Sequence, residues 1–530
     1  MRSTVVVSQK LLYITTVITI AYMATFTDAS INSQLNLTRL KFKSTRILNY
    51  PLPPVITSNV IGTWAYDTMN RRIYKDILPR IIDDNSEELT SPSSPLRSEC
   101  LLLLRDLESS LQCGNTGYLR GLTDSGPDVE QWNSILYSIP EDERNWIHAP
   151  WIIAEFYFYR RIIEAFQYFQ TGYDMFLKQK LDGLVDALPF IDDIAVNLID
   201  LLDSYSVSND SQELRTIIEL ALTTSLWGNK IDLSLWPSIN NAKEEKAVVK
   251  MDSEKEIVLD GRAKVDLNND DNKQDSQRAG TITYGSSIES IRSYILDDQT
   301  RKVVDLLQSL LTERYSTSTS AVDDDRYDSS TNEDQHDRIR EVGIIIDNAG
   351  YEIVSDLLLG YCLVYIGVVD QITFHTKGHP TFVSDATSSD IMNTIDYLAT
   401  SSSEATSIIG HRLLEYVNDG KFKIVDDLFW CQPTAFWDMP DHIYHRLSNS
   451  RLVIVKGDAN YRRLLGDRQW PLDINSSDVL SYWHVPCCAL RTFKAEIGCG
   501  ITEEAQQRAA KSDSKWQVSG KWGVVQLGGL

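Results

Sequence analysis

The feature that most constrains the fold is the alternation of short apolar runs with helical stretches from about residue 341 onward. Short apolar runs between helices are typical of a mainly parallel sheet whose two faces are covered by helices. We therefore predict an α/β fold for this half of the chain. The runs expected to form strands are Val342–Ile346, Gln371–His375, Thr381–Ser384, Leu452–Val455, Ala489–Lys494 and Trp522–Leu527.

The half before residue 238 has a different pattern, because its apolar residues recur at helical spacing. Helices are expected over 64–82, 97–112, Trp151–Phe169 and Ile191–Leu202, and a further one over 288–311. Pro79 is expected to kink or end the first of them. A chain of 530 residues also exceeds the usual size of a single core, so a helical part beside the α/β part is the expected organisation.

Two polar tracts interrupt these patterns and set the expected boundaries. Both are rich in charged and amide residues, which is typical of solvated insertions rather than of a packed core. The expected division is a targeting or extension segment over 1–35, a helical domain over 36–237, a polar insertion over 238–285, a helical segment over 286–315, a second polar insertion over 316–340, and an α/β metal-binding catalytic domain over 341–530.

The first thirty residues are considered apart from the fold. Arg2 and Lys10 precede a mostly apolar run, Leu11–Phe26, which is shorter than the ~20 apolar residues of a membrane-spanning helix. This pattern fits a secretory or organellar targeting segment, and it fits equally an apolar extension without a targeting role.

The charge balance excludes some classes of partner. The formal net charge is −23, and so acidic a surface repels nucleic acid and anionic membranes. We therefore expect no nucleic-acid partner and no stable membrane partner. Because the same surface repels phosphate, a phosphate site would need local cations or a metal ion. The seven cysteines include no CxxC pair, which argues against a disulfide scaffold or a structural zinc site.

Acidic and amide residues follow several of the expected strands. Asp347 and Asn348 follow the first strand, Asp385 follows the Thr381–Ser384 run, and Asp458 follows the Leu452 strand. In α/β sheets, ligands bind beyond the carboxyl ends of the strands. Carboxylate and amide oxygens form a hard ligand set that suits Mg²⁺ or Mn²⁺. Taken alone, Asp347 and Asn348 could also be a turn and a helix cap, but three acidic strand ends favour a site.

Cationic residues lie near the same strand ends and could serve a phosphate dianion. They are Lys377, Arg462, Arg463, Arg491 and Lys494. Ordinary surface ion pairs are the alternative for any one of them. No Walker A loop, GxGxxG, GxSxG or HExxH motif is present, so the common nucleotide, serine-hydrolase and zinc-protease classes have no motif support.

With these residues in place, the sequence resembles the damage-control phosphatase family, specifically its subfamily III. That group includes sugar-phosphate phosphatases and proteins called acidic residue methyltransferases. Arg491-Thr492-Phe493-Lys494 matches the RTxK signature of the subfamily. The other matching stretches are Ala149-Pro150-Trp151 with Glu155, Tyr159-Arg160-Arg161-Ile162, Leu226 to Ser234, Ile346 to Glu352, Val383-Ser384-Asp385, and Lys456 to Leu464 with Asp467 and Trp470.

The resemblance implies a helical N-terminal domain and a Rossmann-like α/β/α sandwich. It also implies a divalent metal (Mn²⁺, Mg²⁺, Ni²⁺ or Co²⁺) held by Asp347, Asn348 and Asp385. The activity implied is that of a metal-dependent phosphoric monoester hydrolase on small phosphorylated metabolites such as fructose 1-phosphate or fructose 6-phosphate, and the compartment implied is the cytoplasm. Asp347, Asn348 and Asp458 are the expected catalytic residues, and the expected substrate contacts are Asp458, Asn460, Tyr461, Arg462, Arg491, Lys494, Glu155 and Arg71.

Two other functions stay open from the sequence. The first is an S-adenosylmethionine-dependent carboxyl methyltransferase, although no Gly-rich loop for that cofactor follows a strand. The second is a non-catalytic interaction protein that uses the helical half as its surface. The exact substrate, the physiological metal and the oligomeric state are not fixed by the sequence.

Overall fold

The computed structural model describes residues 51–91, 97–208, 210–228, 291–319 and 339–529. All of these residues belong to one contact unit, Ser44–Leu530. Outside the described residues lie the expected segments 1–35 and 238–285, the first residues of the helical segment (286–290), and most of the insertion 316–340.

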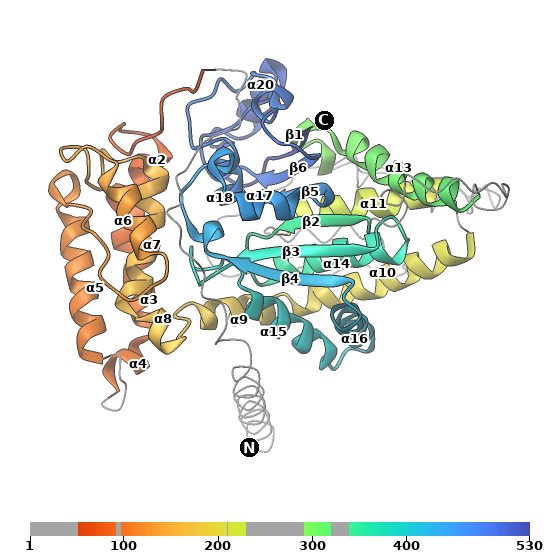
Figure 1. Ribbon diagram of the computed structural model, residues 1–530, viewed down its shortest axis with the longest axis horizontal. Helices are drawn as coiled ribbons and strands as arrows, with labels where there is room; N and C mark the ends of the chain where they lie inside the picture. The colour runs from red at the N-terminus through yellow and green to blue at the C-terminus, as the bar shows by residue number, and fades with distance from the viewer. Residues whose placement is uncertain (1–50, 92–96, 209, 229–290, 320–338, 530) are drawn as a thin grey trace, which may run out of the picture. The chain divides into compact units, whose positions relative to one another are not determined.

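A single seven-stranded sheet organises the described part of the second half of the chain (Figure 1). The strand order is β1-β7-β6-β5-β2-β3-β4, and every neighbouring pair is parallel except β6 and β7. The α/β fold with a mainly parallel sheet is therefore confirmed. The strands are β1 Ile295–Asp298, β2 Glu341–Ile345, β3 Gln371–Lys377, β4 Phe422–Asp427, β5 Ser450–Lys456, β6 Cys487–Thr492 and β7 Gly523–Gly528.

The sheet separates two hydrophobic clusters, because successive side chains of a strand point to opposite faces. Along β5, Leu452 and Ile454 pack into one cluster, whereas Val453 and Val455 pack into the other. Helices α10, α11 and α13–α16 contribute to the first cluster, and the second contains α5, α7 and α18. Because the central strands are buried on both faces, their sequences are continuous apolar runs rather than alternating ones.

Two of the expected elements differ in the structure, and one further strand was not expected. Ile295–Asp298 is the edge strand β1, although the sequence predicts one helix over 288–311. β4 was not predicted, because Lys423, Asp426 and Asp427 interrupt its apolar residues; it is the opposite edge strand and is only partly buried. Thr381–Ser384 is a turn rather than a strand, because the backbone at Phe382 and Val383 is left-handed.

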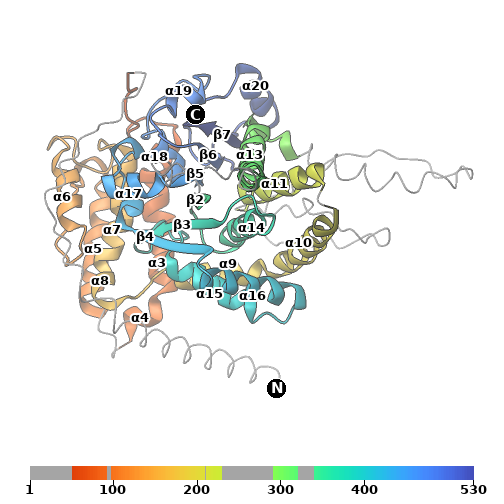
Figure 2. The ribbon, with the colours of Figure 1, turned by 45° about the vertical axis from the view of Figure 1, so that its right-hand side comes forward.

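The described residues between 51 and 228 are helical and contribute no strand to the sheet (Figures 1 and 2). The longer helices here are α5 Arg97–Gln112, α6 Val129–Tyr137, α7 Trp151–Ala165, α9 Leu177–Asp186, α10 Leu188–Ser208 and α11 Ser211–Leu226, and the short ones are α2 Trp64–Asp67, α3 Leu78–Asp84, α4 Ser86–Thr90 and α8 Tyr168–Thr171. The remaining α-helices are α13 Thr300–Thr319, α14 Tyr351–Tyr365, α15 Ser388–Ala399, α16 Glu404–Asn418, α17 Asp441–Leu447, α18 Asp458–Leu464, α19 Ser476–Val479 and α20 Glu503–Ser512.

The expected first helix is continuous but changes its form. α2 leads into a π-helix over Thr68–Ile77, which is followed by α3. Pro79 does not break this run, because it lies in the first turn of α3, where a proline costs no hydrogen bond. A π-helix is wider than an α-helix, is rare, and occurs often at functional sites.

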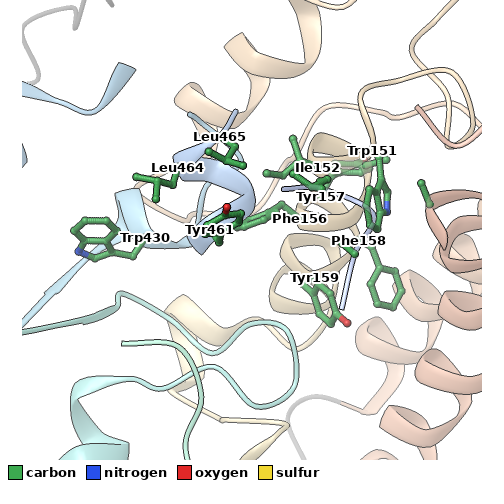
Figure 3. Packing of buried hydrophobic residues seen from close by; sticks show 14 of the residues in the cluster. Trp151, Ile152, Phe156, Tyr157, Phe158, Tyr159, Trp430, Tyr461, Leu464 and Leu465 are labelled. Carbon is green, nitrogen blue, oxygen red and sulfur yellow. The ribbon is translucent and has the colours of Figure 1, made fainter. Parts of the chain in front are cut away.

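Helix α7 is the central element of the helical part. All of its residues except Ile153 are buried, and its apolar side chains cover every side of the helix. A helix of this kind must be enclosed by other elements. Figure 3 shows Phe156 and Tyr157 of α7 in the same cluster as Tyr461 and Leu465 from the region of α18. Because the helices and the sheet share this cluster, α7 lies against the part of the sheet where the ligands are expected.

Among the described helices, none combines the length and the apolar character that crossing a bilayer requires.

Candidate active site

A pocket with a cavity volume of about 360 Å³ lies where the helical part meets the carboxyl ends of the strands. Its lining falls into two groups, which we call the floor and the helical wall. The floor consists of Asp347, Asn348, Ser384, Asp385, Asp458, Ala459, Arg462 and Lys494. The helical wall consists of Trp64, Arg72, Ile77, Trp151, Glu155 and Tyr159, and Phe382, Val518, Ser519 and Gly520 complete the lining.

The floor is built by two chain segments that hydrogen bond to each other. Asp347 and Asn348 follow β2, and Asp385 follows the turn after β3. The backbone N–H of Ala349 donates to the Ser384 carbonyl at 2.7 Å, and the N–H of Ala386 donates to the Asp347 carbonyl at 2.8 Å. These bonds bring together side chains that are far apart in the sequence.

Two of the three carboxylates of the floor, those of Asp347 and Asp385, are buried. Oδ1 of Asp347 has no hydrogen-bond partner, whereas Oδ2 of Asp385 pairs with the buried ammonium of Lys377 at 3.1 Å. Burial, together with repulsion from Asp385 and Glu352, raises the pKa of Asp347 well above its ordinary value. Burial also raises the pKa of Asp385, against the opposing effect of Lys377. Two buried like charges of this kind are stabilised by a cation between them.

The amide of Asn348 is fixed by three contacts. Its Nδ2 donates to Asp347 and to Glu352, each at 2.8 Å, and its Oδ1 accepts a bond of 2.6 Å from the Ser384 hydroxyl. The amide oxygen therefore lies on the Ser384 side, where Ser384 and Asp385 line the pocket. Glu352 lies 3.5 Å from the buried ammonium of Lys456, which also pairs with Asp356 at 3.0 Å.

The donor set fits a hard divalent cation. It contains two buried carboxylates, of which Asp347 has an oxygen without a partner, and an amide; all offer oxygen ligands, and no cysteine lines the pocket. Among the described residues, no group of three or more His, Cys, Asp or Glu side chains forms a metal-binding cluster.

Gly457 allows the turn after β5 to approach this set. Its φ is +80°, and a Cβ at this position would lie 1.9 Å from Oδ2 of Asp347. Only glycine combines that backbone angle with that approach. Asp458 follows directly, and its Oδ1 accepts from Nε of Arg491 at 2.8 Å and from the backbone N–H of Lys494 at 3.3 Å.

The cations that line the pocket differ in their partners. Arg462 pairs with Asp467 at 2.8 Å and with Glu155, and the Trp151 ring lies 3.6 Å from its guanidinium carbon. Within the described part of the chain, neither Lys494 nor Arg72 has an ion pair. Lys494 lines the pocket, and its charge lowers the pKa of Asp347. Arg72 stacks on the Trp64 ring at 4.4 Å.

Seven of the expected site residues line the pocket, and four do not. Asp347, Asn348, Asp385, Asp458, Arg462, Lys494 and Glu155 are the seven. Asn460 is buried behind the floor and donates to the Ile346 carbonyl at 3.0 Å, and Tyr461 donates to Gln526 at 2.7 Å. Arg491 contacts the site only through Asp458. Arg71 lies outside the pocket and pairs with Asp67 and Asp76.

Arg463 also lies away from the pocket. Its guanidinium donates to the Thr434 and Trp430 carbonyls among aromatic rings, and burial lowers its pKa to about 9. The residues that sequence reasoning did not propose come mainly from the helical wall, with Arg72 in place of Arg71. The sequence offers little indication that Arg72 rather than Arg71 would line the pocket, because both residues lie in the π-helix and the apolar spacing does not reveal a π-helix.

The turn that carries Asp385 has an unusual backbone. Phe382 has a φ of +48° and Val383 a φ of +68°. Left-handed conformations cost side chains other than glycine on the order of 1–3 kcal/mol each, and a β-branched valine tolerates them poorly. The ring of Phe382 lies 4.5 Å from the Phe156 ring and 4.5 Å from the Tyr159 ring, both on α7.

Fold and pocket together define an α/β protein whose strands end, at their carboxyl ends, in a pocket lined by carboxylate and amide side chains and enclosed by a helical wall. Comparison with known proteins gives the family. Residues 53–291 and 287–509 match the family described as "Damage-control phosphatase ARMT1-like domain", and the chain belongs to this family.

Several curated relatives are similar along nearly their whole length. The protein named damage-control phosphatase ARMT1 from Xenopus laevis is 28% identical over 498 residues, which cover 90% of this chain and 98% of the relative. The protein of the same name from Homo sapiens is 26% identical over 501 residues, covering 90% and 99%. Among solved structures, a DUF89 family protein from Pyrococcus horikoshii is 12% identical with a TM-score of 0.33, covering 77% of this chain and 93% of the other.

Proposed function

We propose that this protein is a divalent-cation-dependent phosphatase that hydrolyses phosphate monoesters of small metabolites, and that sugar phosphates such as fructose 1-phosphate or fructose 6-phosphate are its substrates. The observation that carries this proposal is the convergence, in one pocket, of the Asp347, Asn348 and Asp385 oxygens with the ammonium of Lys494. Membership of the damage-control phosphatase family supports the reaction class. The RTxK match of Arg491–Lys494 supports subfamily III.

Asp347, Asn348 and Asp385 would hold the cation, which is Mn²⁺, Mg²⁺, Ni²⁺ or Co²⁺. When bound, such a cation neutralises charge on a phosphoryl group and acts as a Lewis acid. Glu352 and Ser384 keep the Asn348 amide in one orientation, so that its oxygen belongs to the donor set. Lys377 offsets part of the buried negative charge at Asp385.

Lys494 would bind the phosphate of the substrate. Its ammonium has no carboxylate partner among the described residues, so its charge is available to an anionic ligand. Arg462 is already held by Asp467 and Glu155, and we therefore assign it to shaping the pocket beside the Trp151 ring. Asp458 is oriented by Arg491 and lines the pocket, where it would position the attacking water or accept its proton.

The helical wall would receive the rest of the substrate. Trp64 and Trp151 line this side of the pocket with the guanidinium groups of Arg72 and Arg462 over their rings, and Arg72 has no ion pair in the described part of the chain. A guanidinium can donate to several hydroxyl or carbonyl oxygens at once, which suits a polyhydroxylated leaving group. A pocket of about 360 Å³ is large enough for a phosphorylated monosaccharide but small for a macromolecular substrate.

The test is phosphate release from a panel of sugar phosphates in the presence of Mg²⁺, Mn²⁺, Co²⁺ or Ni²⁺, with chelator-treated enzyme as the blank. We expect turnover with at least one cation and its loss in Asp347→Ala. Asp419→Ala is the matched control, because Asp419 is exposed and pairs only with Lys421 among the ion pairs described. Normal turnover by Asp347→Ala would refute the site. Binding of S-adenosylmethionine in calorimetry, without phosphate release, would instead favour a methyltransferase.

A further inference from the structure

The connection between β3 and α15 brings Asp385 to the floor, and two of its backbone hydrogen bonds join it to the segment after β2. The N–H of Ala386 donates to the Asp347 carbonyl at 2.8 Å, and the N–H of Ala349 donates to the Ser384 carbonyl at 2.7 Å. Both bonds lie at or after Ser384, and within the turn the N–H of Asp385 donates to the Thr381 carbonyl at 3.2 Å and the N–H of Ser384 to the Phe382 carbonyl at 2.8 Å. The two residues before Ser384, Phe382 and Val383, have the left-handed backbone. The position of Asp385 therefore depends on what maintains that backbone.

The left-handed pair is unusual in this chain. Among the described residues, four that are not glycine have a positive φ, and only Phe382 and Val383 are adjacent to each other. A single left-handed residue is common in turns, but two in succession, one of them β-branched, are disfavoured unless other contacts hold them. Without such contacts, Phe382 and Val383 would relax toward negative φ, and this change would move Asp385 away from its position at the floor.

Besides the turn's own hydrogen bonds, ring contacts from the helical part hold the pair. The Phe382 ring meets the Phe156 ring nearly edge-on, at an interplanar angle of 72°, and meets the Tyr159 ring at 33°, with both centroids at 4.5 Å. Phe156 and Tyr159 are buried on α7, three residues apart, so they lie on the same side of the helix. Figure 3 shows both side chains projecting from α7. The Phe382 ring thus contacts two rigidly placed neighbours.

We propose that Phe382 is a positioning residue: its ring, held by Phe156 and Tyr159 of α7, maintains the left-handed backbone and so keeps Asp385 in the cation site. The helical part would then contribute to cation binding without supplying a ligand. This inference rests on the proposed function, because it takes Asp385 to be a ligand of the cation.

The experiment compares Phe382→Ala with Phe382→Gly. Both changes remove the ring, but glycine adopts positive φ without strain, whereas alanine does not. We expect the dissociation constant for Mn²⁺, measured by calorimetry, to rise about tenfold in Phe382→Ala and no more than about threefold in Phe382→Gly. In metal-free protein, hydrogen–deuterium exchange of peptides containing Ala349 and Ala386 should accelerate about tenfold in the alanine variant and less in the glycine variant.

This order is the reverse of the usual one, because glycine is normally more destabilising than alanine. Tyr173→Ala is the control, since Tyr173 stacks on Phe166 within the helical part; it should leave both measurements near the wild-type values. If Phe382→Ala does not fold, Phe156→Leu removes one of the two holding rings and should accelerate exchange in the same peptides.

Equal or larger effects in Phe382→Gly, or unchanged exchange in Phe382→Ala, would overturn the proposal. The exchange measurement needs no metal. An absence of Mn²⁺ binding in the wild type would therefore count against the proposed function alone, and the exchange rates would still decide whether Phe382 positions the turn.

Discussion

The floor and the helical wall of the pocket are built in different ways. The floor consists of residues at the ends of regular strands, where parallel β2 and β5 end side by side and present Asp347 and Asp458. The wall consists of a π-helix, the buried helix α7 and, between wall and floor, a turn in the left-handed conformation. The comparison teaches that Asp347 and Asp458 follow directly from regular strands, whereas Asp385 and the wall depend on irregular backbone.

The largest effect is expected at the floor. Lys494→Met removes the ammonium that has no ion pair in the described part of the chain, and the loss of one positioned cation typically costs 10²–10³-fold in turnover. We expect kcat to fall by about this factor in steady-state phosphate release. Lys421→Met, at an exposed lysine paired with Asp419, should change kcat by less than about twofold. A small loss in Lys494→Met would show that the phosphate binds elsewhere.

The next prediction concerns the close approach at Gly457. Gly457→Ala combines a backbone angle of +80° with a clash against the Asp347 carboxylate, so it should lower the free energy of unfolding by about 2 kcal/mol or more and abolish Mn²⁺ binding. Urea unfolding and calorimetry measure the two effects.

Gly420→Ala is the matched control, because its φ is +71° and a Cβ there meets nothing within 4 Å. It should cost only the conformational strain, about 1 kcal/mol. Similar losses in the two variants would mean that the approach to Asp347 is not tight.

At the helical wall, the two adjacent arginines offer a direct comparison. Arg72→Gln should raise KM for sugar phosphates about tenfold and leave kcat within about threefold, because the guanidinium lies away from the scissile phosphate. Arg71→Gln should change neither, since Arg71 is half-exposed and pairs with Asp67 and Asp76. Equal effects of the two changes would remove the reason for assigning Arg72 to the substrate.

The smallest effect concerns acid stability at β3. His375 is buried, both of its ring nitrogens lack partners, and burial lowers its pKa to about 3. In the unfolded chain this imidazole takes up a proton near its ordinary pKa of 6.5, whereas in the folded protein it stays neutral down to about pH 3. The contribution of the neutral His375 to the free energy of unfolding is therefore fully present above pH 6.5 and is lost as the pH falls toward 3.

Between pH 6 and pH 5, this residue should account for about 1 kcal/mol of the decline in unfolding free energy. His375→Phe should reduce the decline by that amount in urea titrations at the two pH values. An unchanged decline would indicate that the imidazole is accessible to protons in the folded protein.

The sequence predicted the floor better than the wall, for reasons that particular residues illustrate. β2, β3 and β5 are buried on both faces, so their apolar runs could be recognised, and the acids that follow them mark the strand ends. β1 and β4 are edge strands that carry acidic residues, and for that reason β1 was predicted as helix and β4 was not predicted.

The wall depends on tertiary contacts that spacing does not encode. The π-helix turns Arg72 rather than Arg71 into the pocket, and the turn at Phe382 needs rings from α7, which precedes it in the sequence by more than two hundred residues. Asn460 and Tyr461 were expected at the substrate because they follow Asp458, but their side chains support the floor from behind. The sequence thus predicts that the stretch after Asp458 belongs to the site, but it does not show which of its side chains face the ligand.

The order of strands in the sheet has a consequence for how fast this protein can assemble. β1 pairs only with β7, and Ile295 stands opposite Gly523, so one edge forms only when segments far apart in the chain meet. Contacts of such long sequence separation slow folding, because the loop-closure entropy is lost before the pairing is gained. Until then, β7 has an unpaired edge, and refolding at high protein concentration should favour aggregation over recovery.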